Sequence, residues 1–139
     1  MALTWIAESP ARWDADKARI IGGAPPGIFA LEPYSVGDYL AGDWWRVELD
    51  GRVAGYGWLD AVWGDAEILL AVDPACQLAG VGTFILDQLQ REARDRGLNY
   101  LSNVVRESHP RGAEVTTWLE RRGFQAFEDG VLRRSVSTR

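Results

Sequence analysis

The chain has 139 residues but contains only one cysteine, Cys76, one histidine, His109, and one lysine, Lys17. A single cysteine forms no disulfide within the chain, and one cysteine with one histidine supplies too few ligands for a zinc site. We therefore expect neither a disulfide scaffold nor a metal. Cys76 has no neighbouring base in the sequence, so we interpret it as structural rather than as a nucleophile.

Long apolar runs and an excess of basic residues are also missing. No stretch approaches the roughly 20 apolar residues that cross a bilayer, and the first residues lack a basic segment followed by an apolar one. There are 15 basic and 20 acidic residues, a net charge of −5, which argues against nucleic-acid binding. We expect a cytoplasmic protein with no nucleic-acid or membrane partner.

Length and composition predict a single domain over residues 1–139, in two parts. The first part, 1–43, is expected to hold a strand at 3–7, a helix from Ser9-Pro10 to about Ile21, and a long ordered loop over 22–42. The apolar residues of that loop indicate that it packs on the body or covers a cleft. The second part, 44–136, is expected to form the core.

The second part reads as alternating strands and helices. We expect turns at Asp50-Gly51, Gly64-Asp65 and Asp129-Gly130, a helix end at Gly97, and a strand at 66–72 that is apolar enough to be covered on both faces. The other elements are strands at 44–49, 52–60 and 98–105, helices up to about 96 and at 114–122, and a hairpin over 125–136. This order predicts an α+β fold with a mixed, mostly antiparallel central sheet flanked by helices.

A glycine segment joins the apolar strand to the helix after it. The strand leads through Asp73-Pro74 into Gln77-x-x-Gly80-x-Gly82 and directly into the helix. This order places several backbone N–H groups at a helix N-terminus, which favours binding of an anion such as a diphosphate. The glycines leave room for the anion to reach the backbone. Neither a Rossmann fingerprint nor a Walker loop is present.

Residues 66–97, with Val72-Asp73-Pro74 followed by Gln77-x-x-Gly80-x-Gly82, resemble the acyl-CoA-binding motif of the GNAT N-acetyltransferase superfamily. The resemblance covers about 44–136 and implies the acyl-CoA N-acyltransferase fold with acetyl-CoA as co-substrate. It also implies CoA contacts on the strand, in the glycine segment and on the neighbouring strand. These residues are Leu70, Ala71 and Val72, then Gln77, Leu78, Ala79, Gly80, Val81, Gly82 and Thr83, and finally Asn103.

The acceptor amine must lose a proton, because a lysine-like amine with a pKa of about 10.4 is protonated at neutral pH. Family members often carry a glutamate near the start of this strand, so the resemblance implies Glu67 as the proton acceptor. The alternative is that Glu67 lies in solvent or pairs with an arginine. Asp65 is a second candidate for the proton acceptor.

The chain departs from the family pattern in its last predicted helix. The family commonly has a tyrosine, the general acid for the leaving thiolate, where this chain has Leu119, and an asparagine where it has Gly112. His109, just before that helix, could replace the acid or be an exposed bystander, and Tyr100 is no better placed. The pairs Arg121-Arg122 and Arg133-Arg134 are either solvated surface or contacts of the CoA 3′-phosphate.

These points predict an N-acetyltransferase that moves an acetyl group from acetyl-CoA to a primary amine by direct attack in a ternary complex. The acceptor would be a small molecule or a peptide. Because the tyrosine and asparagine are missing, a non-catalytic acyl-CoA-sensing module that regulates a partner protein is the alternative. Trp44, Trp45, Trp58 and Trp63 either line an acceptor pocket or belong to the core. The sequence leaves open a homodimer, the acyl-chain length and the acceptor.

Overall fold

The computed structural model describes residues 2–24 and 33–136, except for the side chains of Leu78 and Ala79. Within these residues, seven strands form one sheet in the order β1-β2-β3-β4-β5-β7-β6. The strands are β1 (Leu3–Glu8), β2 (Asp43–Leu49), β3 (Arg52–Val62), β4 (Asp65–Val72), β5 (Tyr100–Asn103), β6 (Gln125–Ala126) and β7 (Leu132–Ser135). The helices are α1 (Ala15–Ile20), α2 (Val81–Asp95) and α3 (Gly112–Glu120), with the 3-10 helix η1 (Pro74–Ala79) before α2.

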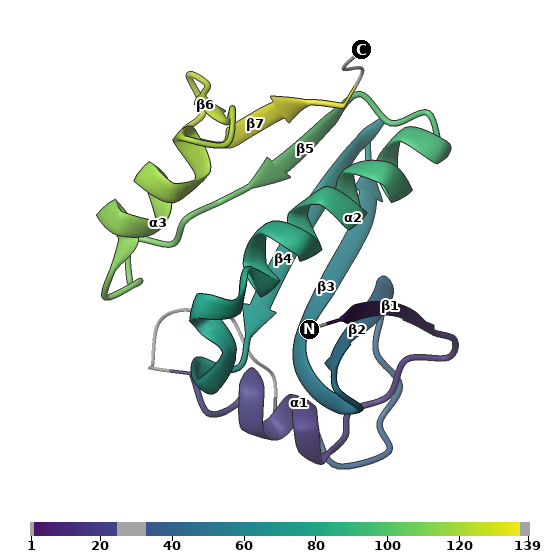
Figure 1. The fold of residues 1–139 in the computed structure, drawn as a ribbon. Coiled ribbons are helices and arrows are strands. Elements are labelled where there is room, and N and C mark those ends of the chain that lie inside the picture. Colours follow the sequence, from purple (N-terminus) through teal and green to yellow (C-terminus); the bar gives the residue numbers. More distant parts are fainter. Residues whose placement is uncertain (1, 25–32, 137–139) are drawn as a thin grey trace.

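Neighbouring strands in this sheet run antiparallel except β4 and β5, which are parallel. The predicted α+β class, with a mixed and mostly antiparallel sheet, is therefore confirmed. Figure 1 shows α2 crossing one face of the sheet and α3 lying beside β5 and β7. No helix in the described ranges is long and apolar enough to cross a membrane.

The sheet carries apolar clusters on both faces because side chains alternate along each strand. The main core lies under α2, where Val81, Ile85 and Leu89 pack against residues such as Leu59 and Ile68. A smaller cluster lies on the opposite face. Its buried members are Trp13, Ile20, Ile21, Tyr56 and Ala71.

The prediction that residues 66–72 are covered on both faces is wrong for the first half of the strand. Glu67 and Leu69 are exposed, although Ala66 and Ile68 on the other face are fully buried. The smaller cluster covers only the later part of β4, around Ala71. This leaves the start of β4 open on the face opposite α2.

The N-terminal segment differs from the expectation in where its helix begins. Asp14, and not Ser9, caps the helix: its side chain accepts the backbone N–H of Lys17 at 2.8 Å. The residues before it are extended and pair with the predicted loop, with Trp13 N donating to Asp38 O at 2.8 Å and Leu40 N donating to Ala11 O at 3.0 Å. The later part of that loop therefore packs on the body as predicted. Its residues Ile28, Phe29 and Leu31 lie outside the described ranges.

The turns and strand ends follow the prediction with small shifts. Asp50 and Gly51 both have positive φ, as the tight β2–β3 hairpin requires. The next hairpin turns one residue earlier than expected, at Trp63-Gly64, and leaves Trp63 99% exposed. Strand 98–105 is shorter than predicted, only β5, because the chain departs from β4 after Asn103.

Candidate active site

Strands β4 and β5 pair over only two residues and then separate. The register is Ala66 with Leu101 and Glu67 with Ser102, whereas β4 continues to Val72. Figure 1 shows the two strands diverging from their paired ends. Among the described residues, the later part of β4 therefore has no strand partner on its β5 side. Unpaired main-chain N–H and C=O groups on such an edge can hydrogen-bond an extended ligand.

Asn103 lies where the two strands part. Its side-chain amide donates a hydrogen bond to the carbonyl oxygen of Ile68 at 2.9 Å. Ser102, one residue earlier, donates its hydroxyl to Ala66 O at 3.4 Å. Side chains of β5 thus satisfy β4 carbonyls where the backbone ladder ends. Asn103, one of the predicted CoA contacts, therefore lies where the two strands separate.

The chain leaves β4 through a capped turn that ends in a left-handed glycine. The carboxylate of Asp73 accepts the backbone N–H of Ala75 at 3.0 Å and a hydrogen bond from the Arg19 guanidinium. The backbone bond first, and Arg19 second, hold the pKa of Asp73 below its usual range. Gly80 then has a φ of 75° and joins η1 to α2. A Cβ at Gly80 would meet no atom within 4 Å, so the approach to this turn is open.

Helix α3 and the turn after it bring an indole and a guanidinium to the beginning of α2. A Cβ placed on Gly82 would lie 3.4 Å from the Trp118 ring and 3.9 Å from Val72. The Arg122 guanidinium lies 3.9 Å from the centre of the Trp118 ring, and its Nη2 is 3.3 Å from Thr83 Oγ1. A positive charge therefore stands beside the first turn of α2, where N–H groups have no partner within the helix. Trp118 lies on α3 and Arg122 in the turn after it, and the sequence did not indicate what these two side chains face.

The predicted CoA residues gather at one end of β4. Gln77 is exposed in η1, and Leu78 and Ala79 follow it there, with side chains outside the described part of the structure. The Val81 side chain is fully buried in the main core, so only its main chain is available to a ligand. The remaining members lie on β4, at the start of α2 and on β5. They are Leu70, Ala71, Val72, Gly80, Gly82, Thr83 and Asn103.

A cavity of about 420 Å³ lies beside the exposed start of β4. Trp44 and Trp58 line it together with Glu67. Trp45 instead stacks on Trp5 inside the core, with ring centres 5.2 Å apart, and Trp63 is the exposed residue at the hairpin tip. Trp45 therefore belongs to the core, Trp44 and Trp58 line a cavity, and Trp63 does neither.

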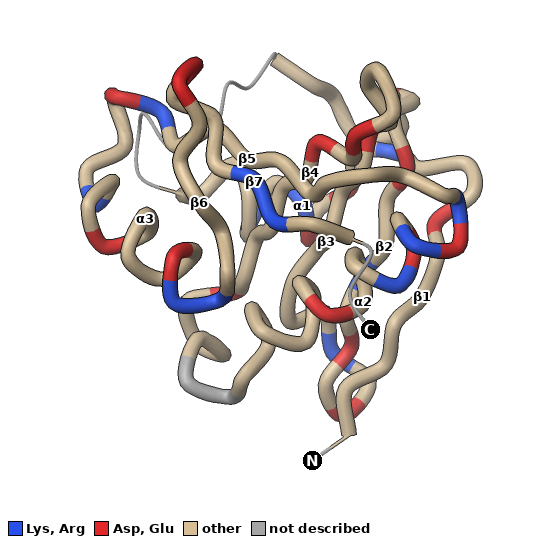
Figure 2. The backbone as a smooth tube through the Cα atoms, turned by 90° about the horizontal axis from the view of Figure 1, so that it is seen from above, with Lys and Arg blue, Asp and Glu red and all other residues tan. Residues whose placement is uncertain are grey.

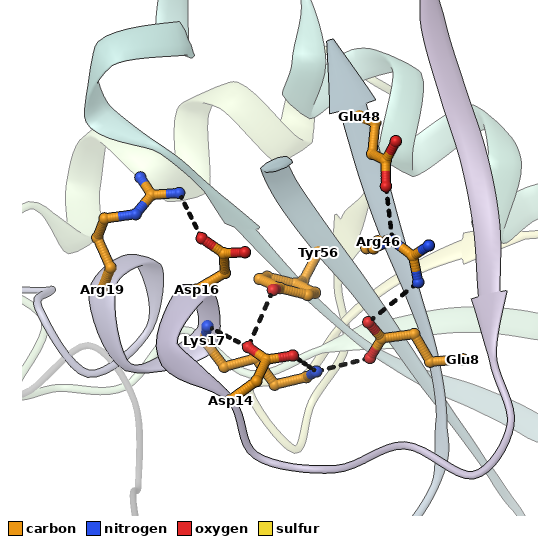
Figure 3. A network of polar contacts seen from close by, with 8 residues as sticks. All are labelled: Glu8, Asp14, Asp16, Lys17, Arg19, Arg46, Glu48 and Tyr56. Carbon is orange, nitrogen blue, oxygen red and sulfur yellow. Dashed lines mark hydrogen bonds and ion pairs between the residues drawn. The ribbon is translucent and has the colours of Figure 1, made fainter. Parts of the chain in front are cut away.

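A buried ionic network supports the floor of this cavity (Figure 3). The ammonium group of Lys17 is fully buried and lies 2.6 Å from Glu8 and 3.0 Å from Asp14. It also lies 4.8 Å from the centre of the Tyr56 ring, which lines the cavity. The Tyr56 hydroxyl is 3.4 Å from Asp14, and burial, with the nearby carboxylates, raises the pKa of Tyr56.

The two candidate proton acceptors have different surroundings. Glu67 is exposed, lines the cavity and makes no ion pair with any described residue. It stands opposite Asp60 on β3 and beside Ser102 on β5. Asp65 lies outside the cavity lining, with its carboxylate 3.9 Å from Arg133. The position of Glu67 in the cavity lining therefore favours it over Asp65 as the candidate proton acceptor.

The residues considered as replacement acids are engaged elsewhere. His109 Nδ1 accepts the backbone N–H of Arg111 at 3.0 Å, at the start of α3. Tyr100 packs edge-on against Phe127, with ring centres 5.8 Å apart. Leu119, at the usual tyrosine position, is 2% exposed within the main core. None of these three side chains lines the cavity beside Glu67.

Arginines on β7 form the basic segment beside β5 in Figure 2. Arg133 pairs with Asp129 at 3.0 Å. Arg134 is partly buried and donates to Gln90 Oε1 at 3.0 Å and to Arg122 O at 2.9 Å, and burial lowers its pKa. This second arginine pair is thus held by the protein itself. Within the described ranges, no three His, Cys, Asp or Glu side chains are grouped as metal ligands.

A β-strand that parts from its parallel neighbour and turns through glycine into a helix defines the acyl-CoA N-acyltransferase fold. Agreement with known sequences makes the assignment firm: the profile of the Acetyltransferase (GNAT) family matches residues 13–130. The chain belongs to this family, which confirms the resemblance seen in the sequence and the expected enzyme class. Comparison with curated proteins gives no significant match.

Solved structures share the fold over most of the chain. N-acetylglutamate synthase from Neisseria gonorrhoeae, bound to coenzyme A and N-acetyl-glutamate, is 21% identical with a TM-score of 0.73, covering 99% of this chain and 36% of that one. The ribosomal-protein-S18-alanine N-acetyltransferase from Escherichia coli is 21% identical with a TM-score of 0.64, covering 99% and 96%. The PaiA N-acetyltransferase from Thermoplasma acidophilum, bound to coenzyme A, is 14% identical with a TM-score of 0.56, covering 66% and 59%.

Proposed function

We propose that the protein transfers an acetyl group from acetyl-CoA to the primary amine of a small-molecule or peptide acceptor, by direct attack in a ternary complex. The observation that carries this proposal is the opening between β4 and β5, which has the glycine turn at one end and the cavity with Glu67 beside it. Nothing in the family assignment supports the alternative, a non-catalytic acyl-CoA-sensing module.

The residues present fit acetyl-CoA as a substrate. The N–H groups at the start of α2 and the Arg122 guanidinium would hold the diphosphate, because both favour negative charge. The unpaired edge of β4, from Leu70 to Val72, would pair with the pantetheine arm, and Asn103 marks where that arm enters. An N–H of the same edge would stabilise the negative charge that develops on the thioester oxygen. Two of the structures with this fold were solved with coenzyme A.

The proposed step is aminolysis of the thioester. The acceptor ammonium gives one proton to the Glu67 carboxylate, directly or through a water molecule. The neutral nitrogen then attacks the carbonyl carbon, the new C–N bond forms, and the C–S bond breaks. The attacking nitrogen loses a second proton, and the CoA thiolate takes up a proton. A thiol with a pKa of about 8.5 is a fair leaving group at neutral pH, so a missing tyrosine slows the reaction without preventing it.

The test combines ligand binding with turnover. Acetyl-CoA should raise the melting temperature, and an amine panel should release free thiol from it. Gly82→Glu should abolish both effects, since its side chain would point at Val72 and Trp118 and bring negative charge to the diphosphate site. An acidic residue in the first turn favours the helix, so the variant should remain folded.

Gly82→Ala is the matched control, because its methyl group makes only an ordinary contact with Trp118. It should keep the acetyl-CoA shift. A wild-type protein that shows no melting shift at saturating acetyl-CoA would overturn the proposal. A shift without thiol release across primary amines of every class would instead favour a module that binds acyl-CoA without turnover.

A further inference from the structure

Strands β2 and β3 form an aromatic wall of the cavity. This wall has no free indole N–H to donate to a ligand. Trp44 and Trp58 both give their indole N–H to Ala41 O, at 3.0 and 3.1 Å. Trp44 also meets Tyr56 edge-on, with ring centres 6.2 Å apart and planes at 76°. The two tryptophans therefore present ring carbons to the cavity. A volume of about 420 Å³ is in the range of small-molecule sites.

A second aromatic wall comes from the N-terminal part of the chain and is fixed in place. Trp13 and Tyr34 stack with ring centres 5.2 Å apart. The backbone of Trp13 is tied to the segment that carries Tyr34 by its hydrogen bond to Asp38 O. The Lys17 ammonium packs against the ring of Tyr56, 4.8 Å from the ring centre. Walls that are already ordered bind a planar apolar group with little loss of freedom.

The cavity lining also carries one group of each charge. Glu67 comes from β4, and Arg106 comes from the segment after β5, across the point where the strands part. Both side chains are exposed, and neither forms an ion pair within the described part of the chain. This pair of charges complements a ligand that carries an ammonium and a carboxylate close together. An arginine fork can also hold a carboxylate through two parallel hydrogen bonds.

Other acceptors use less of this cavity. A polyamine would place positive charge near Arg106 and leave its guanidinium without a carboxylate partner. A peptide N-terminus has no carboxylate on its first α-carbon, and an arylalkylamine leaves Arg106 without a partner. We propose that the acceptor is a free aromatic α-amino acid, with its ring between the aromatic walls, its amine at Glu67 and its carboxylate at Arg106. This inference rests on the proposed acetyl transfer.

The first test compares acceptors that differ by one group. With saturating acetyl-CoA, L-phenylalanine and L-tryptophan should be acetylated. Phenethylamine and tryptamine, which lack the carboxylate, should have kcat/KM values about 10- to 100-fold lower. L-Alanine, which lacks the ring, should be lower by a similar factor of about 10 to 100. Equal rates within these pairs would overturn the inference.

The second test uses variants of the charged arginine and of one aromatic wall. Arg106→Gln should lower kcat/KM for L-phenylalanine to the phenethylamine level and leave phenethylamine unchanged. Arg111→Gln is the matched control, because Arg111 is an exposed arginine of the same segment that pairs with Glu114 outside the cavity. It should change neither substrate. Trp58→Ala should lower the rate with L-phenylalanine about 10-fold and change that with L-alanine much less.

Calorimetric titration of L-phenylalanine into the protein with CoA gives a readout that needs no turnover, and Arg106→Gln should weaken this binding. If spermidine, lysine peptides or peptide N-termini are acetylated and aromatic amino acids are not, this inference fails and the acetyl transfer stands. If acetyl-CoA produces no melting shift, the proposed function fails first. If L-phenylalanine binds with wild-type affinity to the Arg106 variant, the role of Arg106 is overturned.

Discussion

Arg19 on α1 donates a hydrogen bond to Asp73, which directly follows β4. The two residues are far apart in sequence, and the contact ties α1 to the turn that leads into the glycine segment. The same carboxylate caps η1 through Ala75. One carboxylate therefore links α1 to the turn before the glycine segment.

Because of this contact, part of the free energy of unfolding depends on pH in the acidic range. Because the pKa of Asp73 is lower in the folded than in the unfolded protein, its ionised form stabilises the fold above the unfolded pKa. That stabilisation is lost as the pH falls below the unfolded pKa of about 3.9 and through the lower pKa of the folded protein. Asp73→Asn should lower the free energy of unfolding at neutral pH by about 1 kcal/mol. It should also make the free energy of unfolding depend less on pH in the acidic range, which we call the acid limb of the stability curve.

Urea unfolding at several pH values measures both quantities. Asp50→Asn, in the exposed β2–β3 turn, removes a carboxylate without such partners and should leave the acid limb as in the wild type. An acid limb of the Asp73 variant that matches the wild type would show that the ion pair contributes nothing.

Glu67→Gln should reduce kcat about 100-fold at neutral pH, since the carboxamide accepts no proton from the acceptor ammonium. The loss should shrink towards about pH 9, because the amine then loses its proton to solvent without help. The comparison is a pH profile of thiol release for both proteins. Asp60→Asn, directly opposite on β3 but outside the cavity lining, should change kcat less than about 3-fold. A constant ratio across the pH range would argue against proton transfer to Glu67.

Lys17→Met should destabilise the fold by about 3–5 kcal/mol, because Glu8 and Asp14 would keep their charges without the buried ammonium between them. Adding Glu8→Gln to this variant should restore part of the loss. Chemical denaturation of the wild type, both single variants and the double variant gives the coupling energy. If the double variant loses as much free energy of unfolding as the two single variants together, Lys17 and Glu8 are not coupled.

Leu119→Tyr places the usual phenol of the family in a core that has no room for it. With Leu119 only 2% exposed, overpacking should lower the free energy of unfolding by about 1–3 kcal/mol, and kcat should not rise. Leu119→Met conserves volume and should change stability by less than about 1.5 kcal/mol. A faster and equally stable tyrosine variant would show that the missing acid can be restored by one substitution.

Periodicity and turn chemistry predicted most of the fold. The Asp50-Gly51 turn and the helix end at Gly97 stand where the sequence placed them, because positive φ leaves few residue choices there. The N-terminal helix was misplaced because a Ser-Pro pair and an aspartate are both plausible starts, and the choice depends on the pairing of residues 11–13 with 37–40. The exposure of Leu69 depends on what covers a strand, which no local pattern encodes.

The candidate site was predictable only where it is local. The glycine segment is continuous in sequence, so its place before α2 followed from the motif. Trp118 reaches it from α3 and Arg122 from the turn after α3, while Arg106 and Glu67 line one cavity from separate segments. These contacts join residues separated by long stretches of chain, and a single sequence carries no signal for them.

The single lysine, buried beneath Tyr56, has a practical consequence for enzymology. This chain presents no lysine amine on its described surface, so thiol released from acetyl-CoA during an assay cannot come from self-acylation of lysine side chains. Amine-reactive dyes and crosslinkers should likewise spare the folded core, and reaction at Lys17 would report unfolding.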